Sequence, residues 1–132
     1  MTGTDTGAEA AETTGESGTG SAVIAQARAL TRTRLTGFDT HLVDDCLLVV
    51  SELVTNAIRH GGGLVGVDVT AAAGRILLSV QDRSSELPTA AQPSGNWLPG
   101  GYGWPLVCRL AQQVTIRVLD GGGKAIHVRM GV

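Results

Sequence analysis

The stretch THLVDDCLLVVSELVTNAIRHGGG, residues 40–63, combines a long helical pattern with an abrupt end. Asp39 or Thr40 can cap its first turn, and neither Gly nor Pro interrupts it before the three closing glycines. At about 100° per residue its apolar residues form one wide face, namely Val43, Cys46, Leu47, Val50, Leu53, Val54, Ala57 and Ile58. The pattern predicts an amphipathic helix that runs to Arg59 or His60 and packs this face against the core.

The opposite face of this predicted helix carries polar residues at helical spacing. Glu52 and Asn56 are four residues apart, so their side chains lie one above the other. A carboxylate and an amide at this spacing suit Mg²⁺, which is usually held by one or two protein oxygens while substrate phosphates complete its shell. The alternative is a solvated outer face with a weak Glu–Asn contact. Leu48 and Val49 flank Glu52 on this side and count against that alternative.

The rest of the chain alternates helical and strand patterns without a βαβ order. A helix is expected from Ser21 up to the turn at Gly37, and a short one from Pro105 to Leu110 or Gln112. Alternating apolar residues predict two hairpins, one over Val65, Val67, Val69, Ile76, Leu78 and Val80, the other over Val114, Ile116, Val118, Ile126 and Val128. Residues 83–101 read as a long loop, often a functional lid. This order favours an α+β fold with helices layered on a mostly antiparallel sheet.

Asp82 stands at the end of a predicted strand. By the period-two rule it shares the core face with Ile76, Leu78 and Val80. A carboxylate carried to the core needs a partner, because an unpaired buried charge is strongly unfavourable. The exocyclic amine of adenine is one candidate donor. The alternative is that the strand has already ended and that Asp82 caps the turn with Ser84.

Glycines and aromatic residues gather just before the short helix. The sequence Gly100-Gly101-Tyr102-Gly103 opens that helix, and backbone N–H groups of such a turn make an anion site that suits phosphate. Glycines also simply make turns, so this motif alone is weak. Trp97, Tyr102 and Trp104 cluster here as well, either to pack on a nucleotide or partner or to anchor the loop to the core.

Length and composition exclude several classes of protein. The 132 residues suffice for one domain, and 42% hydrophobic with 17% charged residues is typical of a globular chain. Residues 1–20 hold four acids and no base, which predicts a disordered tail and leaves the remainder only slightly basic, too little for a nucleic-acid binder. No apolar run approaches the roughly 20 residues of a membrane span. Cys46 and Cys108 are expected to be buried thiols in a reducing cytoplasm.

Four segments taken in order resemble the N box and three glycine boxes of the GHKL ATPase superfamily, specifically the short anti-sigma-factor serine/threonine kinases. They are SELVTNAIRHGGG (51–63), LLSVQDRSSELP (77–88), GGYGWPLVCRLA (100–111) and GGGKAIHV (121–128). The resemblance implies a Bergerat-type two-layer α/β sandwich, with a mixed, mostly antiparallel sheet covered by helices on one face. It also implies a cytoplasmic ATPase domain over residues 21–132 that uses ATP and Mg²⁺.

The resemblance further implies roles for individual residues. Glu52 would be the general base or water-positioning carboxylate, Asn56 the Mg²⁺ ligand, and Asp82 the residue that reads adenine. Further contacts to the nucleotide would come from Arg59, His60, Ser84, Gly101, Tyr102, Gly103 and Leu106.

The function that the resemblance implies is an ATP-dependent switch. The protein would phosphorylate a serine or threonine of an antagonist protein and otherwise sequester a sigma factor, without contacting nucleic acid or a membrane. A second copy of the chain could pair with an open sheet edge. The alternative is a non-catalytic partner-binding module with weak or no nucleotide binding, which Asp82-Arg83-Ser84 favours, since the family usually has Asp-x-Gly. A self-contained sensor histidine kinase is not expected, because the chain lacks room for a dimerising helical hairpin.

Overall fold

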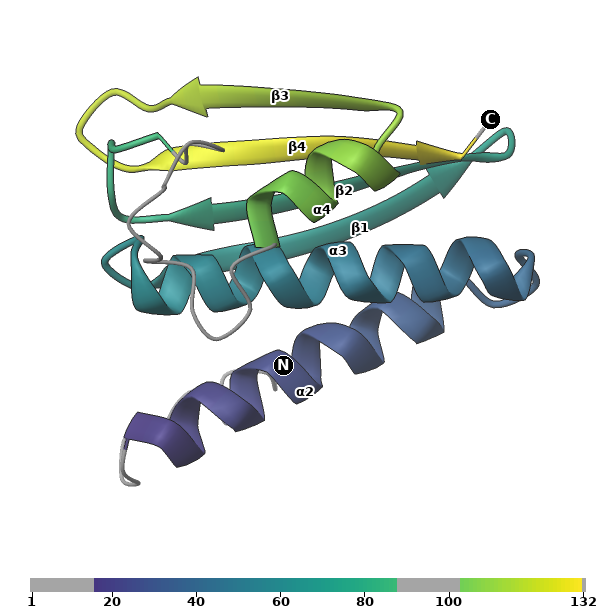
Figure 1. The fold of residues 1–132 in the computed structure, drawn as a ribbon, viewed down its shortest axis with the longest axis horizontal. Helices are drawn as coiled ribbons and strands as arrows, with labels where there is room; N and C mark the ends of the chain where they lie inside the picture. Colours follow the sequence, from purple (N-terminus) through teal and green to yellow (C-terminus); the bar gives the residue numbers. More distant parts are fainter. Residues whose placement is uncertain (1–15, 88–102, 132) are drawn as a thin grey trace.

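The computed structural model describes residues 16–87 and 103–131. Its elements in order are α2 (Glu16–Arg34), α3 (Thr40–Arg59), β1 (Leu64–Ala72), β2 (Arg75–Asp82), α4 (Gly103–Leu110), β3 (Gln113–Val118) and β4 (Lys124–Gly131). The four strands form one sheet in the order β1-β2-β4-β3, and every neighbouring pair is antiparallel. The three helices lie on one side of this sheet (Figure 1). The predicted α+β architecture is confirmed.

Helix α3 is the centre of the helical layer. Asp39 caps it by accepting a hydrogen bond from the Leu42 N–H at 3.2 Å, and the helix ends at Arg59, as predicted. It packs against α2, α4 and the sheet, so its buried arc is wider than the predicted face and includes Val49 at 0% exposure. Leu48 remains 44% exposed. Only one of the two apolar residues beside Glu52 therefore lies on a wet surface.

Helix α2 begins earlier than the sequence pattern indicates. The predicted start was Ser21, whereas the helix begins at Glu16. No proline interrupts the stretch between Glu16 and Ser21, so the backbone can continue as a helix through it. The Arg28 guanidinium donates to Ser51 Oγ at 2.8 Å and ties α2 to α3. Residues 1–15 lie outside the described part of the chain, and the tail stays a prediction there.

The two predicted hairpins are confirmed as β1–β2 and β3–β4, and β2 joins them by pairing with β4. Helix α4 starts two residues before the expected Pro105 and ends at Leu110. Trp104 is only 7% exposed and packs into the core, which supports the anchoring interpretation for this residue. Most of the predicted lid, with Trp97, falls within residues 88–102, outside the described part.

The two cysteines differ, and one prediction about them was wrong. Cys46 is buried, and burial together with the charge of Asp45 raises the pKa of its thiol to about 12. Cys108 is exposed, because α4 turns only one face to the core, where Val107 is fully buried. Both thiols are free. Among the described residues, none of the helices is long and apolar enough to cross a bilayer.

Candidate functional site

Asp82 is delivered to the core side by the pleat of β2. Residues 76, 78, 80 and 82 are all buried, while their neighbours along the strand are more accessible. Asp82 itself is 5% exposed at the last position of the strand. The sequence prediction that this carboxylate faces inward is confirmed.

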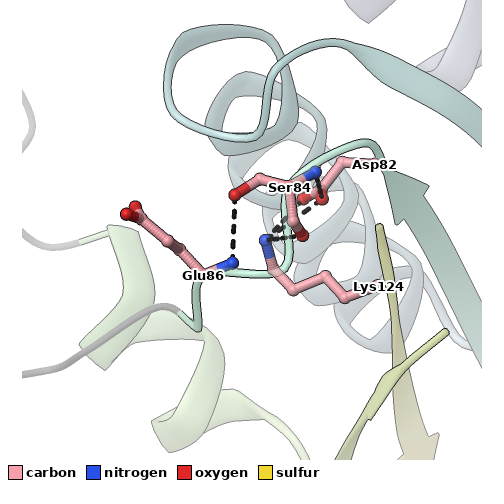
Figure 2. A network of polar contacts seen from close by, with 4 residues as sticks. All are labelled: Asp82, Ser84, Glu86 and Lys124. Atoms are coloured by element: carbon pink, nitrogen blue, oxygen red, sulfur yellow. Dashed lines mark hydrogen bonds and ion pairs between the residues drawn. The ribbon is translucent and has the colours of Figure 1, made fainter. Parts of the chain in front are cut away.

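The carboxylate of Asp82 has two partners within the protein, which Figure 2 shows. Lys124 Nζ lies 2.9 Å from Oδ2 and 3.1 Å from Oδ1, and the backbone N–H of Ser84 donates to Oδ1 at 3.0 Å. Ser84 Oγ in turn accepts from the N–H of Glu86 at 3.0 Å. Asp82 is therefore a buried residue of the strand, and the alternative that the strand ends before it is wrong, although the predicted contact between Asp82 and the Ser84 turn is present.

The glycines after α3 bring that helix to the end of β2. A Cβ at Gly61 would stand 2.5 Å from Asp82 Oδ2, so only glycine lets the carboxylate sit against this loop. The Arg83 N–H donates to the carbonyls of Gly61 and Gly63 at 2.9 and 3.1 Å. Gly123 approaches from the other side, where a Cβ would lie 2.6 Å from the Asp82 carbonyl oxygen. These close approaches explain why α3 ends in glycines.

Glu52 and Asn56 occupy successive turns of α3 and are both half-buried. Asn56 Nδ2 is buried and finds no hydrogen-bond partner among the described residues. Leaving such a donor unsatisfied costs about 1–3 kcal/mol, and its presence in a folded protein calls for an explanation. Burial raises the pKa of Glu52, while the positive charge of Arg59 opposes the shift. A carboxylate with a raised pKa is a better proton acceptor near neutral pH.

The remaining predicted contacts are distributed around these groups. Arg59 and His60 are exposed at the end of α3, Gly103 is buried at the start of α4, and Leu106 is half-buried one turn later. Gly101 and Tyr102 lie outside the described residues. The structure therefore brings Asp82 against Gly61, just beyond the last turn of α3 that carries Asn56, whereas the predicted phosphate cradle stays a prediction.

Lys124 is a residue of this site that sequence reasoning missed. It is only 4% exposed and stands directly opposite Asp82 in the β2–β4 ladder. The sequence holds one signal, since Lys124 is the only lysine in the chain and follows the turn of three glycines. That signal becomes informative only when the pairing of β2 with β4 is known.

The donor set limits what metal site is available. Among the described residues no group of three or more His, Cys, Asp or Glu side chains could hold a metal ion. The Glu52 carboxylate and the side-chain oxygen Oδ1 of Asn56 are the only ligands proposed from α3. So few protein ligands fit a Mg²⁺ ion whose coordination is completed by phosphate oxygens. The unsatisfied Nδ2 of Asn56 is a donor that a phosphate oxygen would satisfy. The residues present therefore fit a magnesium–phosphate group.

Comparison with known proteins identifies the family and the fold of the chain. The family model for the histidine kinase-like ATPase domain matches residues 8–130. Among solved structures, the chain is similar to the histidine kinase domain of a blue-light-activated histidine kinase from Erythrobacter litoralis EL346, with a TM-score of 0.53 and 18% identity. That match covers 85% of this chain and 60% of the other, and at this identity it shows the fold alone. No curated protein matches. The chain belongs to the family of histidine kinase-like ATPase domains, within the GHKL superfamily.

Proposed function

We propose that this protein is an ATP-dependent serine/threonine protein kinase of the anti-sigma-factor type. In this proposal it binds Mg²⁺-ATP beside the C-terminal half of α3, transfers the terminal phosphoryl group to a hydroxyl of an antagonist protein, and otherwise sequesters a sigma factor. The family match supports the ATPase part of this proposal. The choice of protein substrate and partners rests on the resemblance of the four sequence boxes.

The observation that carries the proposal is the pair of partly buried polar side chains, Glu52 and Asn56, on successive turns of α3. Asn56 presents a buried donor without a partner among the described residues, and Glu52 has a raised pKa one turn away. A simple outer helix face would hydrate both groups fully. An oxygen-rich ligand such as a triphosphate satisfies the amide, and its terminal phosphoryl group then lies within reach of Glu52.

Phosphoryl transfer requires positioning and neutralisation of charge more than covalent chemistry. Glu52 accepts the proton of the attacking serine or threonine hydroxyl and orients it, which its raised pKa favours. Asn56 donates to a phosphate oxygen through Nδ2. A bound Mg²⁺ would neutralise charge on the phosphates. At the other end of the nucleotide, Asp82 accepts a hydrogen bond from the amino group of the base.

The test separates binding from transfer. The purified chain should bind Mg²⁺-ATP by calorimetric titration, and it should phosphorylate an antagonist that copurifies with it and is identified by mass spectrometry. Glu52→Gln should bind ATP with parental affinity and slow the transfer by about 10²- to 10⁴-fold, the usual contribution of a general base.

Asp44→Asn is the matched control, because Asp44 is an exposed acid on the same helix. It should change neither binding nor transfer. Transfer by Glu52→Gln at the parental rate would remove Glu52 from the mechanism. Failure of the parental chain to bind ATP at millimolar concentration would remove the kinase altogether.

One observation favours a second candidate function. The Asp82 carboxylate is already engaged by Lys124 and by the Ser84 N–H. A protein that had lost nucleotide binding could keep such a pair as a purely structural element and act by capturing a partner. Partner capture without ATP binding in the same titration would support this non-catalytic module.

A further inference from the structure

The starting point is the buried ion pair at the end of β2, where Asp82 and Lys124 face one another across the β2–β4 ladder. Each side chain is 6% exposed. Removing two charges from water is expensive, and the pair is tolerated only if good geometry and further hydrogen bonds compensate. The site must therefore be judged by how completely each of the two groups is satisfied.

Lys124 is satisfied entirely by the protein. Its ammonium group has three N–H donors. It has three acceptors within reach, namely Asp82 Oδ2 at 2.9 Å, Asp82 Oδ1 at 3.1 Å and the Ser84 carbonyl oxygen at 3.3 Å. Figure 2 shows the ammonium group between these atoms. These acceptors from the described part of the chain match the three donors, so we do not expect Lys124 itself to contact a ligand.

The described residues satisfy Asp82 almost entirely, but they leave one acceptor position of its carboxylate without a donor. An ionised carboxylate offers about four lone-pair positions, two on each oxygen. Oδ1 accepts from Lys124 and from the Ser84 N–H, whereas Oδ2 accepts from Lys124 alone. Oδ2 is also the oxygen next to Gly61, where a Cβ would stand only 2.5 Å from it, so a glycine at position 61 leaves this oxygen uncovered by a side chain of that loop. Within residues 16–87 and 103–131, the carboxylate position without a donor is thus on Oδ2.

We propose that Lys124 is the positioning residue for base recognition. It keeps the Asp82 carboxylate ionised and fixes its rotation, so that Oδ2 presents one lone pair to the exocyclic amino group of a purine. The proposal rests on the nucleotide binding proposed above and adds a selectivity: a base that carries an amino group binds more tightly than the same base without it. The Ser84 N–H assists by fixing Oδ1.

The experiment uses two nucleotides that differ only in that amino group. ATP and purine riboside 5′-triphosphate are titrated with Mg²⁺ into the parental chain and into Lys124→Met. The parental chain should prefer ATP by about tenfold or more, since hydrogen bonds to charged groups are the strong ones. In Lys124→Met the buried carboxyl loses its cation, and the ratio of the two affinities should approach one. A merely structural role would weaken both nucleotides equally and keep the ratio.

Two further variants keep the test decisive. Lys124→Arg retains a cation and should restore part of the preference, while Lys124→Gln retains a donor without charge and serves if the methionine variant does not fold. Arg129→Met is the matched control, because Arg129 is an exposed cation on the same strand. It should leave the preference unchanged.

The single lysine offers an independent readout. Lysine labelled with ¹³C at Cε gives one side-chain resonance in this chain. ATP should shift that resonance more than purine riboside triphosphate does, because only ATP brings a donor to the partner carboxylate. An unchanged preference in both neutral variants would overturn the role of Lys124 alone. Absence of binding by either nucleotide to the parental chain would instead overturn the proposed function, so the two failures are distinguishable.

Discussion

The two polar ends of the candidate site differ in how far the protein satisfies them. At the end of β2, the Asp82 carboxylate accepts hydrogen bonds from Lys124 and from the Ser84 N–H, and it forms an ion pair with Lys124. On α3, the amide nitrogen of Asn56 has no partner among the described residues. The difference follows from the energies involved. A buried charge without a partner is strongly unfavourable, whereas an unsatisfied neutral amide costs about 1–3 kcal/mol.

This contrast suggests a division of work. The end that would read the base is pre-organised, so its orientation does not have to be established when a ligand binds. The end that would hold phosphate is left incomplete, and the ligand supplies the missing acceptor. Gly61 joins the two, because it directly follows the last turn of α3 and lies against Asp82 Oδ2.

The largest effect on stability is expected at the buried ion pair between Asp82 and Lys124. Asp82→Ala leaves the Lys124 ammonium buried without its counter-ion, and breaking such a pair costs about 3–5 kcal/mol. Urea denaturation should therefore show a free energy of unfolding lower by that amount.

The double variant Asp82→Asn with Lys124→Met sharpens this prediction. It removes both charges at similar volume, and replacing a whole buried pair is often close to neutral. The double variant should therefore recover most of the stability lost in Asp82→Ala. Equal losses in the two variants would mean that shape, and not charge, holds this end together.

A smaller effect is expected at the junction. Gly61→Ala adds a Cβ at 2.5 Å from Asp82 Oδ2 and 2.9 Å from the Cα of Ala57. Overpacking of this kind typically costs about 1–3 kcal/mol. Gly66→Ala is the matched control, since a Cβ there meets nothing within 4 Å.

Thermal unfolding of the two alanine variants measures the difference. Gly61→Ala should unfold at a clearly lower temperature than Gly66→Ala, and it should also weaken ATP binding, because Oδ2 is displaced. Equal melting temperatures would show that the junction is compliant and that the two ends of the site are not coupled through Gly61.

The sequence was most informative where local rules decide the outcome. The cap at Asp39, the end of α3 before three glycines and the inward face of β2 all follow from neighbours in the chain, and all were predicted. Cys108 was wrong because its burial depends on which side of a short helix meets the core. Val49 is buried because α3 has neighbours on several sides, which the periodicity of one helix does not reveal.

The partner of Asp82 could not be predicted for a different reason. Lys124 is 42 residues away in sequence and becomes adjacent only because β2 pairs with β4 rather than remaining in a separate hairpin. Lys124 Nζ also donates to the Ser84 carbonyl oxygen at 3.3 Å, so the same pairing of strands helps to hold the turn that follows β2.

The smallest effect is expected from the open end of the site. Because burial raises the pKa of Glu52 above its ordinary value of 4.5, the folded state binds more protons than the unfolded state around and above that pH. The contribution of Glu52 to the free energy of unfolding therefore decreases as the pH rises from 4.5 through the raised pKa of the folded state. Glu52→Gln removes the dependence, so the variant should gain stability relative to the parental chain between pH 4.5 and 7. The gain should stay within about 0.5 kcal/mol, since Glu52 is partly solvated and Arg59 opposes the shift.

Urea denaturation midpoints at pH 4.5 and pH 7 measure this gain, and Asp44→Asn corrects for the change in net charge. A loss of stability in Glu52→Gln at pH 7 would mean that the carboxylate already has a stabilising partner, and the contrast between an open and a closed end would then disappear.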